Sequence, residues 1–81
     1  MKISTIKQLA QKHELEKLRA LEAAIENEED VSAEVPGEDD GDRLTNVSAA
    51  IWIKEQMEKN GSDLKTEIRN YSQRVRNSIS S

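Results

Sequence analysis

The chain has 81 residues, of which 35% are hydrophobic and 35% charged, and it contains no cysteine. A chain of this length forms one domain at most, which we expect to span residues 1–81, and without cysteine it has no disulfide, thiolate metal site or cysteine nucleophile. The net charge of −4 is modest, which excludes strong self-repulsion and favours folding of an otherwise polar chain.

Two helices are predicted at the start of the chain, over about residues 4–12 and 14–28. Their stripes of Ile and Leu are out of phase at ~100° per residue, so a break is expected near His13. His13 is the only histidine, which excludes a two-histidine metal site within one chain. At a helix break a polar residue is expected for structural reasons alone.

A connector over residues 29–42 is expected to join the second helix to the third. Nine of the sixteen acidic residues lie between Glu26 and Asp42, and no Lys or Arg lies among them. The flanking segments are mildly basic, at +2 for residues 1–25 and +3 for residues 43–81. The sequence therefore predicts a basic helical body with a solvated acidic connector.

The connector begins with Val31, Ala33 and Val35, which alternate with polar residues and predict a short extended segment. Pro36 favours an extended residue before it and starts a turn with Gly37. The acidic residues do not fit a calcium-binding loop, because both registers of the EF-hand pattern place Pro36 at a ligand position. A weak cation site is the alternative to a solvated loop.

The third predicted helix, over about 43–59 with Asp42 as its cap, is apolar on nearly all sides. Between Val47 and Ile53 only Ser48 is polar. A helix that is apolar all round is a buried one, so we expect this to be the central helix.

A fourth helix is predicted over about 63–79, after a stop at Asn60–Gly61. Because the link is short, we expect the third and fourth helices to pack antiparallel as a hairpin. The fourth helix has the clearest apolar stripe in the chain, formed by Leu64, Ile68, Tyr71, Val75 and Ile79.

The expected fold is therefore all-α, a small bundle of three to four helices with a long acidic connector between helices two and three. A central helix with two apolar faces needs more cover than two short helices and one long one supply, so a twofold-related second chain is expected to complete the burial. The interface candidates are Val47, Ile51, Trp52, Ile53, Met57, Tyr71 and Val75. The candidates for electrostatic contacts are Glu38, Asp39, Asp40, Lys65, Arg69, Arg74 and Arg76.

Four short segments carry a resemblance to a known family: Gly37-Glu38-Asp39, Leu44-Thr45, Ala49 to Ile53, and Gln73 to Arg76. The chain resembles a family of short, uncharacterised bacterial α-helical proteins over nearly its whole length. Members often have Ser or Thr at the start of the second helix and His in the third, where this chain has Glu14 and Asn46. The resemblance implies a small helical protein and brings no catalytic residue with it.

No catalytic constellation, metal site or cofactor site is recognisable in the sequence. The leading hypothesis is a homodimeric protein-interaction module without catalytic activity. The alternative is a regulatory protein that binds a basic partner or nucleic acid, as an antitoxin-like or charge-mimicking protein would. Nucleic acid is the less favoured partner, because no aromatic platform or recognised motif accompanies the basic residues of the last helix. We expect a cytoplasmic protein without a signal peptide, since Lys7 and Lys12 interrupt the first apolar stretch.

Overall fold

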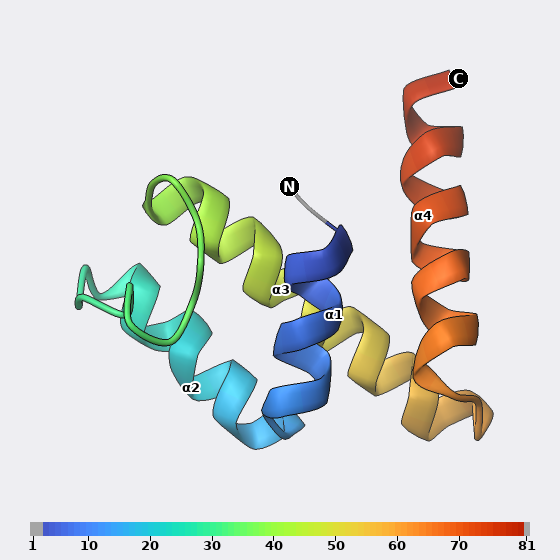
Figure 1. Cartoon of the computed structure of the whole chain (residues 1–81), viewed down its shortest axis with the longest axis horizontal. Helices are drawn as coiled ribbons and strands as arrows, with labels where there is room; N and C mark the ends of the chain where they lie inside the picture. Colours follow the sequence, from blue (N-terminus) through green and yellow to red (C-terminus); the bar gives the residue numbers. More distant parts are fainter. Residues whose placement is uncertain (1–2, 81) are drawn as a thin grey trace.

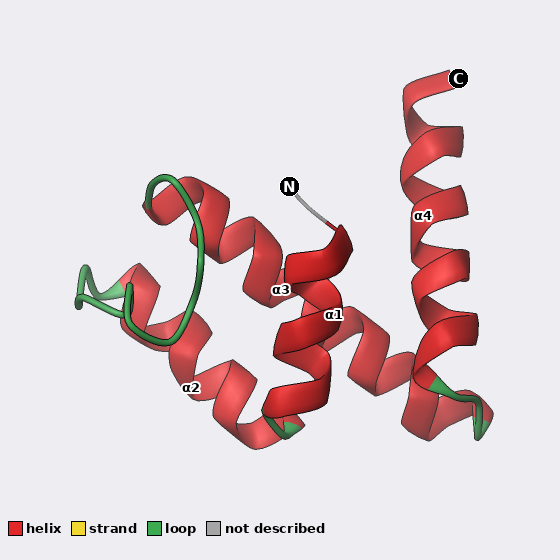
Figure 2. Cartoon of the chain, viewed as in Figure 1, coloured by secondary structure: helices red, strands yellow, loops and turns green. Residues whose placement is uncertain are grey.

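The structure is a computed structural model that describes residues 3–80, and the side chains of residues 3–76 (Figure 1). Its helices are α1 (Ile3–Lys12), α2 (Leu15–Glu26), α3 (Asp40–Asn60) and α4 (Leu64–Ser80). No strand occurs within the described range, as Figure 2 shows. The prediction of an all-α fold is confirmed.

Helix α3 lies at the centre of the fold, because α1, α2 and α4 all contact it. Val47, Ala50 and Ile53 of α3 are fully buried although they point to different sides of the helix. This stretch has no polar side, and other helices pack against it on several sides. The predicted central position of this helix is confirmed.

The same packing corrects the expectation that a second chain is needed to cover α3. Three interface candidates, Val47, Ile51 and Ile53, are buried inside the protomer at exposed fractions of 0, 9 and 0%. They belong to the core, which also takes residues from α1, α2 and the connector. Its other members are Ile6, Leu9, Ala10, Leu18, Leu21, Ile25, Val31, Val35, Ala49 and Ala50.

The predicted break between the first two helices is present, since α1 ends at Lys12 and α2 begins at Leu15. His13 lies between them, half-buried, and its backbone N–H donates to the carbonyl of Leu9. The two helices diverge from this corner and each packs on α3. The apolar stripes of α1 and α2 are out of phase because each helix packs separately on α3.

The segment between α2 and α3 differs from the predicted extended strand. Residues 31–35 form a single helical turn, in which the N–H of Val35 donates to the carbonyl of Val31. Val31 and Val35, four residues apart, are both buried, whereas Ala33 is exposed. The carboxylate of Asp30 caps the turn by accepting from the N–H and the hydroxyl of Ser32. Alternation of apolar residues was misleading here because positions 31 and 35 also share a face of a helix.

Gly61 closes α3 in the left-handed conformation, at φ 62°, as the sequence predicts. Helix α4 then rises at a steep angle to α3, so the predicted antiparallel hairpin is wrong (Figure 1). Consequently the apolar stripe of α4 is covered only in part, by α3 and α1. Leu64, Ile68, Tyr71 and Val75 are all half-buried, and the side chain of Ile79 lies outside the described residues.

Candidate functional site

The acidic residues that precede α3 form the start of that helix. Asp39 is the N-cap, and its carboxylate accepts from the N–H of Asp42 at 2.8 Å. The carboxylate of Asp42 in turn accepts from the N–H of Glu38 at 3.1 Å. These reciprocal bonds satisfy free N–H groups at the helix start, where the helix dipole also favours negative charge. The helix therefore begins at Asp40, three residues before the predicted start, and the cap is Asp39 rather than Asp42.

Two side chains of α3 hold the connector in place: Asn46, noted in the sequence only as a departure from the family, and Arg43, which was not singled out. The amide of Asn46 donates to the carbonyl of Pro36 at 3.0 Å, and the guanidinium of Arg43 donates to the carbonyl of Gly37 at 3.2 Å. Arg43 also pairs with Asp40 at 3.1 Å. The acidic stretch is thus tied to α3 at its centre rather than freely solvated. The sequence did hold a signal for this pair, because positions 43 and 46 lie on one face of the first turns of α3.

The acidic run does not assemble into a metal site. Among the described residues, no three His, Asp or Glu side chains are placed to hold one ion. Of the three predicted acidic contacts, Asp39 serves as the cap, Asp40 pairs with Arg43, and Glu38 uses its backbone N–H in the cap. The side chain of Glu38 is exposed and remains available to a partner.

Glu67 is a carboxylate that the sequence analysis did not consider and that the structure buries, at an exposed fraction of 2%. It accepts hydrogen bonds from the Ser62 hydroxyl and from the amides of Asn60 and Asn70. The bond from Ser62 is the main cause that holds the pKa of Glu67 below its ordinary value, against the opposing effect of burial. The cluster closes the link between α3 and α4, and its donors lie close in sequence on both sides of that link.

The outer face of α3 carries an aromatic pair flanked by a cation. The rings of Trp52 and Tyr71 are tilted, with centroids 5.7 Å apart. The guanidinium of Arg74 lies 5.6 Å from the Trp52 ring, within range of a cation–π interaction. Burial raises the pKa of the Tyr71 hydroxyl. Three predicted residues are therefore brought together, while Trp52 keeps part of its surface in water.

Beside this pair lies a shallow hollow of about 430 Å³ between α3 and α4. Of the residues that line it, Thr45 and Ser48 are exposed and Ala49 is buried. The full lining is Leu44, Thr45, Ser48, Ala49, Trp52 and Tyr71. We call this surface, together with Arg74, the α3 outer face. Its lining combines the half-buried rings of Trp52 and Tyr71 with the smaller side chains of Thr45, Ser48 and Ala49.

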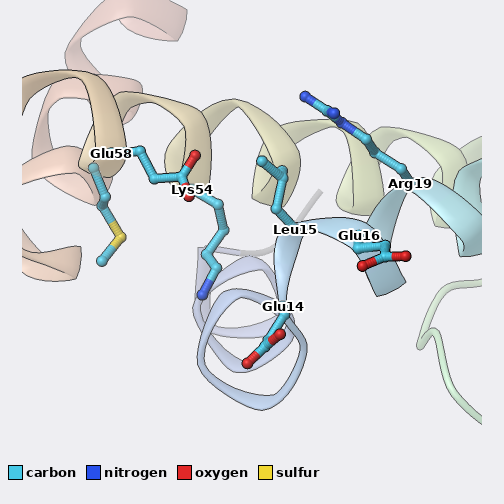
Figure 3. A pocket seen from close by; sticks show the side chains of 7 residues that line it. Glu14, Leu15, Glu16, Arg19, Lys54 and Glu58 are labelled. Atoms are coloured by element: carbon cyan, nitrogen blue, oxygen red, sulfur yellow. The ribbon is translucent and has the colours of Figure 1, made fainter.

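The remaining candidates lie apart from the α3 outer face. Val75 is half-buried on α4, and Lys65, Arg69 and Arg76 are exposed on the same helix. Met57 lines a different surface, an open groove between the start of α2 and the second half of α3 (Figure 3).

The groove of Figure 3 has a volume of about 720 Å³ and a lining of mixed charge. Leu15 and Met57 supply its apolar part. Its charged residues are Glu14, Glu16, Arg19, Lys54 and Glu58. At its margin Arg19 pairs with Glu55 at 2.8 Å, and both side chains are about half exposed. Such water-exposed pairs contribute at most ~1 kcal/mol each to stability. The groove is therefore an open surface of mixed charge.

The sequence model of DUF6952, a family of unknown function, matches residues 1–80 of the chain. The chain belongs to this family. The predicted resemblance to a family of uncharacterised proteins is confirmed. No match was found among curated proteins or among solved structures.

The DUF6952 match covers all four helices and the connector, so the α3 outer face and the tie between Asn46 and Pro36 both lie within the family's region. Across the part of this DUF6952 chain that the structure describes, every helix is too short or too polar to cross a bilayer.

Proposed function

We propose that the chain is a protein-interaction module without catalytic activity that forms a homodimer through the α3 outer face. The observation that carries the proposal is the half-buried Trp52, which contacts both Tyr71 and Arg74 and lines a hollow. Trp, Tyr and Arg are the residues most enriched at the energetic centres of protein interfaces. All three gather at one place on a surface that is otherwise rich in Glu and Lys.

A partner chain would complete the burial that α4 leaves unfinished. No apolar side chain of α4 between residues 64 and 76 is fully buried, although Tyr71 and Val75 belong to its apolar stripe. The reason for a dimer is thus different from the one the sequence suggests. The core of α3 is covered within one chain, whereas the outer edge of the contact between α3 and α4 is not.

Charge favours a second copy as the partner. Residues 26–42 carry −9 and residues 43–81, which supply the whole α3 outer face, carry +3. A chain that is acidic in one segment and basic in another can complement itself across a twofold axis, which is the commonest symmetry of soluble oligomers. No partner of another composition is needed to satisfy both segments.

A non-catalytic role is part of the same proposal. Catalysis requires a few polar groups that converge in a site largely closed to water. The groove of Figure 3 is instead bordered by exposed Glu14, Glu16 and Glu58. The α3 outer face offers three hydroxyls, those of Thr45, Ser48 and Tyr71, and the first two already donate to Gly41 and Glu22.

Sedimentation velocity over a range of micromolar concentrations tests the dimer. We expect the wild-type chain to sediment at twice the protomer mass. Trp52→Ala should weaken self-association about 30-fold or more, the usual effect of truncating a central interface residue. The matched control is Met57→Ala, which truncates another half-buried apolar residue of α3 on the side of the groove.

Circular dichroism of each variant separates lost association from lost folding. A wild-type monomer throughout the concentration range would refute the homodimer. Equal self-association by the Trp52→Ala chain would refute the α3 outer face as its interface.

A further inference from the structure

The link between α3 and α4 has the features of a helix-turn-helix. Three residues, Gly61 to Asp63, join the two helices, and Gly61 adopts the left-handed conformation. Helix α4 stands at a steep angle to α3 and packs on both α3 and α1 (Figure 1). Two helices at a steep angle, joined by a short turn that contains glycine, form the motif whose second helix enters the major groove of DNA. The antiparallel hairpin predicted from the sequence would have excluded this motif.

The exposed side of α4 is basic. Lys65, Arg69 and Arg76 are all exposed, and their spacing places them within ~40° of one another around the helix. They extend over about three turns, or ~16 Å along its axis. The one acidic residue of α4, Glu67, is only 2% exposed. A line of bases with no exposed carboxylate on the same helix is complementary to a row of phosphates.

The other charges of the molecule lie away from this line. Arg74 points to another side of α4, where it contacts Trp52, and Asp63 caps the helix by accepting from the N–H of Thr66. The acidic connector and α4 lie at opposite ends of the longest dimension of the molecule, which measures 31 Å (Figure 1). Charges in water are largely screened beyond ~10 Å at 0.1 M salt. The net charge of −4 therefore does not prevent α4 from meeting phosphates.

We propose that the chain binds double-stranded DNA through the exposed side of α4, with Lys65, Arg69 and Arg76 on the phosphates. A helix with its side chains is about 10–12 Å across, which fits the major groove of B-form DNA at about 12 Å. Gln73 is exposed ~40° around the helix from Arg69, so it can reach base edges when the bases of α4 hold the backbone. This activity goes beyond the homodimer and does not depend on it, because all of these residues belong to one chain.

Fluorescence anisotropy with a labelled DNA duplex of about 20 base pairs tests the proposal. Three phosphate contacts predict that log K falls with log salt at a slope of about −2.7. The affinity should therefore drop about 40-fold between about 50 and about 200 mM salt. A wild-type chain that does not bind the duplex at the lower salt concentration would overturn the proposal.

The double variant Lys65→Gln with Arg69→Gln tests whether α4 makes the contacts. It should bind about tenfold more weakly or worse at low salt, and its loss between the two salt concentrations should shrink to about fourfold, because one contact remains. The matched control, Lys17→Gln with Arg19→Gln, removes one Lys and one Arg from exposed positions of α2. It should bind within about threefold of wild type, since those charges lie away from α4. An equal loss in both variants would mean that affinity follows net charge alone, which would refute α4 as the site.

A duplex RNA of the same sequence distinguishes the major groove of DNA from phosphate in general. The major groove of duplex RNA is too deep and narrow for side chains to read, so binding should be about tenfold weaker or worse. Equal affinity for the two duplexes would refute the insertion of α4 into DNA, and with it the proposal. A wild-type chain that sediments as a monomer but binds DNA as described would refute the homodimer alone.

Discussion

Asn46 on α3 donates its side-chain amide to the carbonyl of Pro36, ten residues earlier, at 3.0 Å. Asn46 is 2% exposed and Pro36 is exposed, so the bond is partly buried. It fixes the connector near its middle, within the acidic stretch. The connector thereby carries Val35 into the core and delivers Asp39 to the start of α3.

Substitution of Asn46 by Ala should destabilise the protein by ~1–3 kcal/mol, because the Pro36 carbonyl would lose a buried donor. Urea denaturation followed by circular dichroism measures the change. The control Ser48→Ala removes an exposed hydrogen bond from the same helix and should alter stability by no more than ~0.5 kcal/mol. Equal stability of the two variants would show that Asn46 does not anchor the connector.

The two glycines that flank the helix start should respond to alanine with opposite signs. A Cβ at Gly37 would lie 2.6 Å from Cγ of Arg43 and 3.0 Å from its backbone nitrogen. Gly37→Ala should therefore cost ~1–3 kcal/mol of unfolding free energy, as overpacking does.

At Gly41, inside α3, the nearest atom to an added Cβ is Oδ1 of Asp39 at 3.4 Å. Gly41→Ala should stabilise by ~0.5–1 kcal/mol, because alanine loses less entropy in a helix. Urea midpoints of both variants against wild type measure the signs. Destabilisation of similar size at both sites would contradict the described packing of Arg43 on the connector.

Helix α2 ends on a residue in an unfavourable conformation. Glu28 has φ 61°, and the N–H groups of Glu28 and Glu29 donate to the carbonyls of Ile25 and Ala24. This arrangement is the Schellman motif, in which glycine is the usual residue at the left-handed position.

Glu28→Gly should accordingly raise the free energy of unfolding by ~1 kcal/mol, because glycine adopts the left-handed conformation without the Cβ conflict. The preceding Asn27 has φ −89°, so Asn27→Gly serves as the control and should lower stability. Thermal denaturation of the two variants compares them directly. A loss of stability in Glu28→Gly would be inconsistent with the observed helix end.

Glu67 should make stability depend on pH in the acid range. Its pKa in the folded chain is lowered from 4.5, chiefly by the hydrogen bond from Ser62. Since the folded state holds the proton less tightly than the unfolded state, the stabilisation is complete above pH 4.5 and is lost as the pH falls through the folded pKa. Asp30 and Asp63, whose pKa values are also lowered by hydrogen bonds, act in the same direction.

Urea denaturation at a series of pH values isolates the contribution of Glu67. Glu67→Gln should be less stable than wild type near neutral pH but should lose stability less steeply in acid. Ser62→Ala removes the main cause of the lowered pKa, so its acid loss should begin at a higher pH than in wild type. Parallel pH profiles for all three chains would show that Glu67 is not held as its carboxylate.

The hydrophobic periodicity was sufficient to place four helices and the break at His13, because amphipathic stripes record which side of a helix meets the core. The periodicity could not decide the backbone conformation of residues 31–35. Val31 and Val35 lie on the same side both in a strand and in one helical turn. The choice between the two depends on the cap that Asp30 and Ser32 form once the turn packs on the helices. The contribution of Arg43 was likewise hidden, since a surface arginine and one that holds a loop carbonyl look alike in a sequence.

The sequence alone determined that residues 47–53 form the centre of an all-α fold, because a helix without a polar side has no stable place in water. Only the tertiary structure decided what covers that centre and what stays open. The steep angle of α4 leaves Trp52, Tyr71 and Arg74 together at the surface, while Val47 and Ile53 are fully buried within the protomer. Helix angles depend on how side chains of distant segments interlock, and that information is not local to any stretch of the chain.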